Sequence, residues 1–280
     1  MKALIDEFVN NLIYGKKVSS NTVAAYKGDL NGLLLFLNNH GYEDIGTVNF
    51  TILNSYILSM EKDKMSCASI SRRISVIKSF FEYLFYNGYI KTNPAYNLKP
   101  PKVVKKAPDI IEEDDMVKFL ASIDISDNVG MRDRAMFELM YYTGIRVVEI
   151  ISLKISDIDI TMGSVTVINE RKGRSIPLES DTVKILDKYI KEDRQKFNPV
   201  CDKLFVNRLG QGLTRQGIVV ILDTYRQNFK YKELLIPGVF RRSYAVRMIE
   251  KGTDLKRLQY LLGDSSLVTT EVYATYKKSK

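Results

Sequence analysis

The sequence predicts a mainly α-helical fold of two domains, an N-terminal four-helix domain and a C-terminal α+β domain with a small antiparallel three-stranded sheet. Apolar residues recur at helical spacing through the first hundred residues. A proline- and lysine-rich segment then interrupts the pattern, and short runs of β-branched residues follow between 157 and 178. We expect the domains at 1–98 and 109–280, with a linker at 99–108.

Four helices are predicted in the N-terminal domain, over residues 5–13, 23–37, 50–60 and 70–84. The last has the clearest pattern, because its apolar residues form one stripe. The stripe consists of Ile70, Ile74, Ile77, Phe81 and Leu84. Arginine, lysine and serine fall on other faces of this helix, where they suit phosphate and groove contact. An ordinary amphipathic helix with a solvated face is the alternative interpretation.

Basic residues are concentrated in and after this helix. The chain holds 42 Lys and Arg against 33 Asp and Glu, a net charge of +9. Between Lys62 and Lys106 there are ten basic and two acidic residues, a surplus of eight. Such a concentration favours a nucleic-acid partner over a merely solvated face. The candidate DNA-binding residues are Arg72, Arg73, Lys78, Lys102, Lys105 and Lys106.

The linker is the most proline-rich part of the chain. Three prolines and four lysines occupy the eleven residues from Leu98 to Pro108. Proline cannot continue a helix and the lysines repel one another, so we expect an extended strap. A clamp of two domains around DNA needs a connection of this kind.

The sequence indicates no cofactor, no metal site and no membrane span. Cys67 and Cys201 stand far apart without metal-ligand spacing and suit a reducing compartment. The longest aliphatic run, 33–37, is too short to cross a bilayer, and acidic residues stand where a signal peptide is apolar. We expect a soluble, cytoplasmic protein.

The C-terminal domain is expected to begin with helices and then form its sheet. Strands are predicted at 157–160, 164–168 and 175–178. Turns containing Gly163 and Gly173 separate them. Pro177 lacks an amide hydrogen and should keep the third strand at an edge. Further helices are expected at 113–121 and 132–142, after Ser180, and after Thr214.

Three short helices are predicted in the last forty residues, the first beginning at Pro237. Arg241 and Tyr273 then lie on separate helices that can face one point. A guanidinium binds phosphate oxygens in a two-pronged way, and a tyrosine oxygen can attack phosphorus. The pair therefore suits a phosphodiester, whereas a buried tyrosine and surface arginines are the alternative interpretation.

Three further stretches support the phosphodiester interpretation. Residues 141–150 read Tyr-Tyr-Thr-Gly-Ile-Arg-Val-Val-Glu-Ile, 165–178 predict two strands with a basic turn, and 70–84 precede the prolines of the linker. Together with the spacing from Leu262-Gly263 to Tyr273, these stretches resemble the tyrosine recombinase (phage integrase) family, most closely its compact Xer-type members. The resemblance covers nearly the whole chain. Its most specific parts are the Thr-Gly-x-Arg-x-x-Glu stretch and that spacing.

The resemblance implies that 1–98 is a core-binding, DNA-binding domain and that 109–280 is the catalytic domain. The family breaks and rejoins DNA through a 3′-phosphotyrosyl link, and Tyr276 is a rival to the implied nucleophile. The matching residues are Tyr273 as nucleophile, Arg146 and Arg241 as the pair that neutralises nonbridging oxygens, Lys172 as the acid for the departing 5′ oxygen, and Glu149 as a supporting acid.

The chain departs from the family at both histidine positions. Gly238 stands where the first is expected, and Asp264 where the second, or a tryptophan, is expected. The single histidine of the chain is His40, in the other domain. A carboxylate at 264 repels phosphate unless Arg241 or Arg242 pairs with it. We expect Arg242 or an ordered water to take over from the missing imidazole.

The tail is the third departure. Seven residues follow Tyr273, whereas the family continues into a helix that docks on a neighbouring subunit. The expected partners are double-stranded DNA and, as a tetramer on DNA, further copies of the chain or a related recombinase.

We favour a site-specific recombinase, performing integration, excision, inversion or resolution. The main alternative is a DNA-binding protein on the same scaffold that does not cut and acts as an architectural or regulatory factor. A helical nucleic-acid-binding protein outside the family, and an activity like that of type IB topoisomerases, are further alternatives. A protein outside the family requires that Arg146, Lys172, Arg241 and Tyr273 do not converge.

Overall fold

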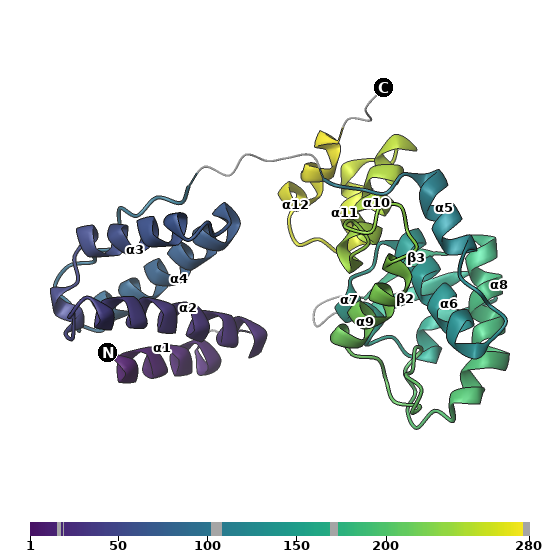
Figure 1. Ribbon diagram of the computed structural model, residues 1–280, viewed down its shortest axis with the longest axis horizontal. Coiled ribbons are helices and arrows are strands. Elements are labelled where there is room, and N and C mark those ends of the chain that lie inside the picture. The colour runs from purple at the N-terminus through teal and green to yellow at the C-terminus, as the bar shows by residue number, and fades with distance from the viewer. Residues whose placement is uncertain (16–17, 19, 102–107, 169–172, 277–280) are drawn as a thin grey trace. The chain divides into compact units, whose positions relative to one another are not determined.

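The computed structural model describes residues 1–15, 18, 20–101, 108–168 and 173–276. The chain divides into an N-terminal unit, Met1–Val104, and a C-terminal unit, Lys105–Lys280 (Figure 1). Among the described residues, no helix combines the length and the apolar content that a membrane crossing requires.

In its described residues, the N-terminal unit contains four α-helices. They are α1 (Lys2–Tyr14), α2 (Ser20–Asn39), α3 (Phe50–Lys62) and α4 (Cys67–Tyr86), with a 3₁₀ turn at Ile45–Thr47. The predicted stripe of α4, from Ile70 to Leu84, is buried against the other helices. Burial of this stripe supplies most of the driving force for packing α4 at the centre of the unit. The four-helix prediction is confirmed.

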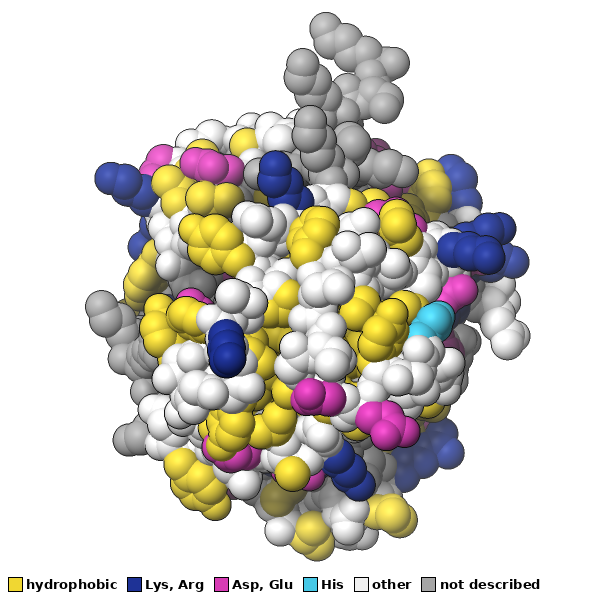
Figure 2. All heavy atoms as spheres, turned by 90° about the vertical axis from the view of Figure 1, so that its left-hand side faces the viewer, with side chains coloured by type: hydrophobic (Ala, Val, Ile, Leu, Met, Phe, Trp, Pro, Cys, Tyr) yellow, Lys and Arg dark blue, Asp and Glu magenta, His cyan; other side chains and the backbone are white. Residues whose placement is uncertain are grey.

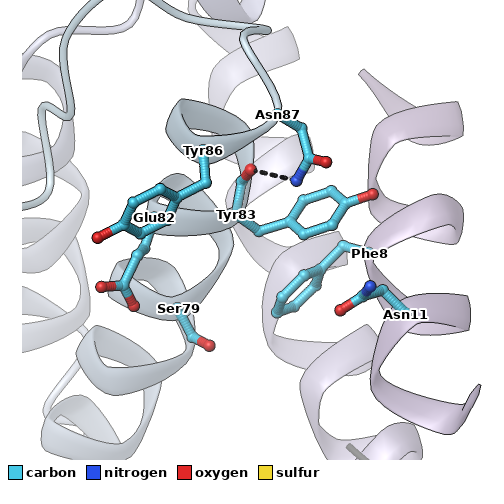
Figure 3. A pocket seen from close by; sticks show the side chains of 7 residues that line it. All are labelled: Phe8, Asn11, Ser79, Glu82, Tyr83, Tyr86 and Asn87. Carbon is cyan, nitrogen blue, oxygen red and sulfur yellow. Dashed lines mark hydrogen bonds between the residues drawn. The ribbon is translucent and has the colours of Figure 1, made fainter. Parts of the chain in front are cut away.

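The contact between α1 and α4 combines aromatic packing with a polar anchor. Phe8 of α1 lies 5.4 Å from the Tyr83 ring centroid, and the Tyr83 hydroxyl donates to Glu7 over 2.7 Å. Burial, together with that hydrogen bond, raises the pKa of Tyr83 to about 12. Asn87 closes α4 by donating to the Tyr83 carbonyl over 2.8 Å. Figure 3 shows the hollow beside this contact, lined by Phe8, Asn11, Ser79, Glu82, Tyr83, Tyr86 and Asn87.

The C-terminal unit combines helices with one small sheet. Its α-helices are α5 (Glu113–Ala121), α6 (Asn128–Thr143), α7 (Val147–Ile150), α8 (Ser180–Lys188), α9 (Arg215–Arg226), α10 (Pro237–Glu250), α11 (Leu255–Leu262) and α12 (Leu267–Glu271). The long helix α6 lies in the middle of this unit and packs against α8 and α10 (Figure 1). A 3₁₀ turn, η5 (Val272–Thr275), follows α12 directly.

The sheet has the strand order β1-β2-β3, all antiparallel. Its strands are β1 (Ile158–Asp159), β2 (Ser164–Ile168) and β3 (Gly173–Pro177). Val165 pairs with Ile176 in register, and both are buried on the inner face. Pro177 lies on the edge strand, where its missing amide hydrogen costs no ladder bond. The predicted mainly α fold with a three-stranded antiparallel sheet is thus confirmed.

Candidate active site

A glycine turn brings Arg146 into place. Helix α6 ends in Gly144, which adopts a left-handed conformation with a φ of 62°. A Cβ atom there would lie 2.5 Å from Tyr244 Cδ1, so both the backbone and the space require glycine. Arg146 then caps α7, and its amide donates to Glu149 Oε2 over 2.7 Å. The Arg146 guanidinium is therefore fixed at the start of a short helix.

Arg146 and Arg241 converge on one oxygen atom. The Nη2 atoms of both arginines donate to Asp264 Oδ1, each over 2.7 Å. Arg146 Nη1 also donates to the Gly263 carbonyl over 3.1 Å, and Arg241 Nη1 to the Gly144 carbonyl over 2.8 Å. The Arg241 side chain is 12% exposed and that of Arg146 is 35% exposed. Arg146 therefore keeps an edge open to solvent.

Hydrogen bonds fix both the side chain and the backbone of Asp264. It follows Gly263, which ends α11 in a left-handed conformation, and its side chain is 3% exposed. Its amide donates to the Gln259 carbonyl, and its carbonyl accepts from Gln259 Nε2, both over 3.1 Å. The second carboxylate oxygen accepts from Thr270 Oγ1 of α12 over 3.1 Å. The carboxylate is thus paired with Arg241 and Arg146, and no bond to Arg242 occurs among the described residues.

A third guanidinium, from Arg174 of β3, lies behind Arg146. Arg174 donates to both oxygens of Glu149, over 2.8 and 2.9 Å, and its Nε donates to the Leu261 carbonyl over 2.8 Å. Burial alone would raise the pKa of Glu149, but the bonds from Arg174 and from the Arg146 amide outweigh it and lower that pKa. Glu149 is therefore a carboxylate that holds two arginines in place.

Sequence reasoning missed both Arg174 and Thr270. The burial of β3 alternates, with Arg174 and Ile176 inward. A charged residue on the inward face of a predicted strand needs a buried partner, and that alternation is a signal that points to Arg174. No comparable local pattern marks Thr270, whose hydroxyl matters only because Asp264 lies beside it.

Tyr273 lies on η5, directly after α12. It is half-buried and packs against the apolar cluster of Tyr244, Ala245, Leu258 and Leu262. Among the described residues its hydroxyl has no hydrogen-bond partner. Tyr273 is thus joined to the arginine pair through α12 and Thr270, and not by a bond of its own hydroxyl.

Tyr276 differs from Tyr273 in its hydroxyl. It donates to Glu112 Oε1 over 2.6 Å. This hydrogen bond, with burial and the charge of Glu112, raises the pKa of Tyr276 to about 12. The Tyr276 oxygen is therefore engaged and harder to ionise than a free phenol.

The sequence pattern of the phage integrase family matches residues 109–280, more than half of the chain. The chain belongs to this family. A pattern described as the phage integrase N-terminal SAM-like domain matches residues 5–88. The chain is similar to tyrosine recombinase XerD of Listeria monocytogenes serotype 4b (strain F2365), at 34% identity covering 99% of this chain and 95% of the relative. The resemblance drawn from the sequence is confirmed.

A second curated relative and two solved structures agree with this assignment. Tyrosine recombinase XerC of Oceanobacillus iheyensis is 32% identical over 99% of this chain and 93% of its own length. The XerH site-specific recombinase bound to a palindromic difH substrate has a TM-score of 0.79 at 19% identity, covering 99% of this chain and 82% of that one. A lambda integrase dimer bound to a COC′ core site has a TM-score of 0.77 at 18% identity, covering 100% and 99%. At these identities the two structures show a shared fold.

Gly238, which the resemblance predicts at the first histidine position, is the second residue of α10. A Cβ atom at Gly238 would lie 3.0 Å from Arg242 Nη1, so the Arg242 guanidinium lies beside the empty position. Arg242 Nε donates to the Asp109 carbonyl over 2.7 Å, which holds the side chain there. The described residues contain no cluster of three or more metal-ligating side chains.

Several residues predicted for catalysis or for DNA binding have other partners or lie outside the described residues. Lys172, Lys102, Lys105 and Lys106 lie outside the described residues. Arg72 donates to both oxygens of the buried Asp29, and Arg73 forms an ion pair with it over 3.4 Å. Lys78 is half-buried on the same helix. Arg72 and Arg73 thus tie α4 to α2, a role that sequence reasoning did not anticipate.

Figure 2 shows one face of the molecule, on which Lys and Arg side chains are dispersed among hydrophobic and acidic ones. Within the part of the chain that the structure describes, this face carries no continuous basic patch. The described Lys and Arg side chains on this face therefore do not form one cluster.

Proposed function

We propose that this family member is a site-specific DNA recombinase that cuts and rejoins double-stranded DNA through a 3′-phosphotyrosyl intermediate. The observation that carries the proposal is the convergence of Arg146 and Arg241, each 2.7 Å from one oxygen of Asp264. Two guanidiniums that converge on one oxygen can also bind the nonbridging oxygens of one phosphodiester. The names of the XerD and XerC relatives, and the DNA-bound XerH and lambda integrase structures, support DNA as the substrate.

In the proposed reaction the Tyr273 oxygen attacks phosphorus. A bond forms between that oxygen and phosphorus, the bond to the 5′ oxygen breaks, and the phenol proton passes to solvent. Lys172 gives a proton to the departing 5′ oxygen, and rejoining reverses these steps. Arg146 and Arg241 offset the negative charge that builds on the nonbridging oxygens, a contribution that is usually the largest in such sites.

The charges of the cluster match one phosphodiester. Arg146, Arg174 and Arg241 carry three positive charges, and Glu149 and Asp264 carry two negative ones, so the balance is 3 − 2 = +1. A phosphodiester carries one negative charge, which offsets the charge of these five residues before Arg242 and Lys172 are counted. Arg242, beside Gly238, adds a cation that we assign to the place of the missing imidazole.

Tyr273 is a better candidate for the nucleophile than Tyr276. The Tyr276 hydroxyl is bound to Glu112 and its pKa is raised to about 12, whereas the Tyr273 hydroxyl has no partner among the described residues. A phenol must lose its proton to attack, so a raised pKa disfavours Tyr276.

The N-terminal unit is proposed to clasp one side of the duplex, with Lys102, Lys105 and Lys106 of the linker against the backbone phosphates. Assembly of several copies, or of a copy with a related recombinase, is part of the proposal because two DNA sites must be exchanged. We place this work in the cytoplasm, where the free Cys67 and Cys201 remain reduced.

A DNA-binding protein that does not cleave is the second candidate function. It is favoured by Gly238, which has no imidazole to accept or donate a proton. The loss of one such group slows catalysis by about 10²–10³-fold, which leaves a slow enzyme and not an inert one. We therefore keep the recombinase as the main proposal.

A DNA substrate with a nick just beyond the cleavage point separates the two candidates. The freed end diffuses away, so a cleaving enzyme becomes trapped as a covalent adduct. We expect an adduct that survives denaturant, with mass spectrometry locating the phosphodiester on Tyr273. Duplex binding without any adduct would select the non-cleaving protein.

A further inference from the structure

Asp264 connects three separate elements of the C-terminal unit. Its Oδ1 atom receives Arg146, at the start of α7, and Arg241 of α10. Its Oδ2 atom receives Thr270 of α12, three residues before Tyr273. The carboxylate thus joins both arginines to the segment that carries the tyrosine.

A carboxylate at this point has two possible roles. It could act as an internal anion that occupies the arginines and leaves when phosphate arrives, or as a fixed bridge. To leave the arginines, the Asp264 carboxylate would have to break the hydrogen bonds of both its oxygens. The backbone of Asp264 is also fixed, because its amide and its carbonyl are hydrogen-bonded to Gln259. The side chain is 3% exposed and Thr270 is fully buried, so the carboxylate has no free path to solvent. The geometry favours the fixed bridge.

We propose that Asp264 is a positioning residue that holds Arg146 and Arg241 at a fixed spacing and ties them, through Thr270, to the Tyr273 segment. This proposal rests on the proposed recombinase function. Two guanidiniums that share one oxygen repel each other, and the carboxylate charge offsets that repulsion. The solvent-exposed edge of Arg146 remains free for the phosphate.

A histidine at position 264, which the resemblance implies, could not replace the carboxylate in this role. A neutral imidazole has one acceptor nitrogen and a protonated one has none. Histidine at position 264 therefore cannot receive two arginines and a threonine hydroxyl. Restoring the family's usual residue by D264H should lower activity, not raise it.

The first test measures the single-turnover rate of adduct formation on saturating nicked DNA, beside DNA affinity. We expect D264A to slow the rate on the order of 10²-fold. D264N keeps an acceptor oxygen but loses the charge, and should slow it by about tenfold. DNA affinity should stay the same because contacts along the whole duplex dominate it. D181N is the matched control, since the Asp181 side chain is 84% exposed and forms an ion pair with Lys184.

The second test needs no cleavage. A double-mutant cycle of D264N and T270V in urea unfolding should be non-additive, because the two side chains share a bond. The matched cycle of D264N and T270S should be additive, because serine keeps the hydroxyl and loses only a buried methyl group. Additive effects of D264N and T270V on stability would overturn the proposal. A D264H or D264N variant that forms the adduct as fast as the wild type would also overturn it. A wild type that forms no adduct would refute the recombinase function, and the cycle would still decide whether the bridge exists.

Discussion

Asp29 in the N-terminal unit and Asp264 in the C-terminal unit are both buried carboxylates that engage two arginines. Asp29 receives Arg72 and Arg73, neighbours on the single helix α4. Asp264 receives Arg146 and Arg241 from separate elements. The same chemical group therefore ties two helices together in one unit and gathers distant parts of the chain in the other.

Each cluster also has a tyrosine, and the two tyrosines differ in access. The Tyr56 hydroxyl accepts from Arg73 Nη1 over 3.2 Å, but Tyr56 is only 4% exposed. Burial raises the pKa of Tyr56 above its ordinary value. Tyr273 is half-buried and has no hydroxyl partner among the described residues. An arginine pair with a carboxylate and a tyrosine is thus no sign of chemistry unless the tyrosine can reach a substrate.

The largest expected effect is on adduct formation, when each of the tyrosines is replaced by phenylalanine. Y273F removes the attacking oxygen and should reduce adduct formation on the order of 10⁶-fold, to background. Y56F and Y276F should keep the adduct, because neither hydroxyl is available to DNA. Gel analysis after denaturation measures all three. Loss of the adduct in Y276F alone would move the nucleophile to that position.

The next effect concerns Glu149 and its dependence on pH. The pKa of Glu149 is lowered in the folded chain from its ordinary value of 4.5. Its stabilisation is therefore complete above about pH 4.5 and is lost as the pH falls through the lowered pKa. E149Q should be less stable than the wild type by about 2–3 kcal/mol at pH 7, because it leaves Arg174 partly unpaired.

Urea unfolding at a series of pH values checks this expectation. The difference between E149Q and the wild type should shrink below pH 4.5. A difference that stays constant down to acid pH would show that the charge of Glu149 contributes nothing to stability.

A smaller effect is expected at Asp29. D29N removes the charge that pairs with Arg72 and Arg73 and should destabilise the protein by about 1–3 kcal/mol, since Arg72 is half-exposed and partly solvated. Urea unfolding measures it. The rate of adduct formation at saturating DNA should not change, because Asp29 serves packing alone. A D29N variant as stable as the wild type would show that the Asp29 charge does not stabilise the packing of α4 against α2.

Local patterns in the sequence predicted the helices and strands. The α4 stripe follows helical spacing, and Pro177 marks an edge strand through its missing amide hydrogen. Gly144 and Arg146 could be placed because a helix end and a helix start are local features. These parts of the fold depend on residues that are close together in the sequence, so they can be predicted from local sequence patterns.

The connections of the site could not be predicted in the same way. Arg146 and Asp264 are 118 residues apart in sequence, and Arg174 and Glu149 are 25 apart. No spacing rule links such pairs, since only the packing of α7, β3, α10 and α11 brings them together. Sequence reasoning therefore identified Asp264 as a departure from the family, but not as the bridge between both arginines.

The most direct test compares the two clusters in one assay. The single-turnover rate of phosphotyrosyl formation is measured on saturating nicked DNA for the wild type, R146A, R241A and D29N. The account predicts a fall of about 10²–10³-fold for each arginine variant and an unchanged rate for D29N. Arginine variants that react as fast as the wild type would contradict it, because the phosphate would then lie elsewhere.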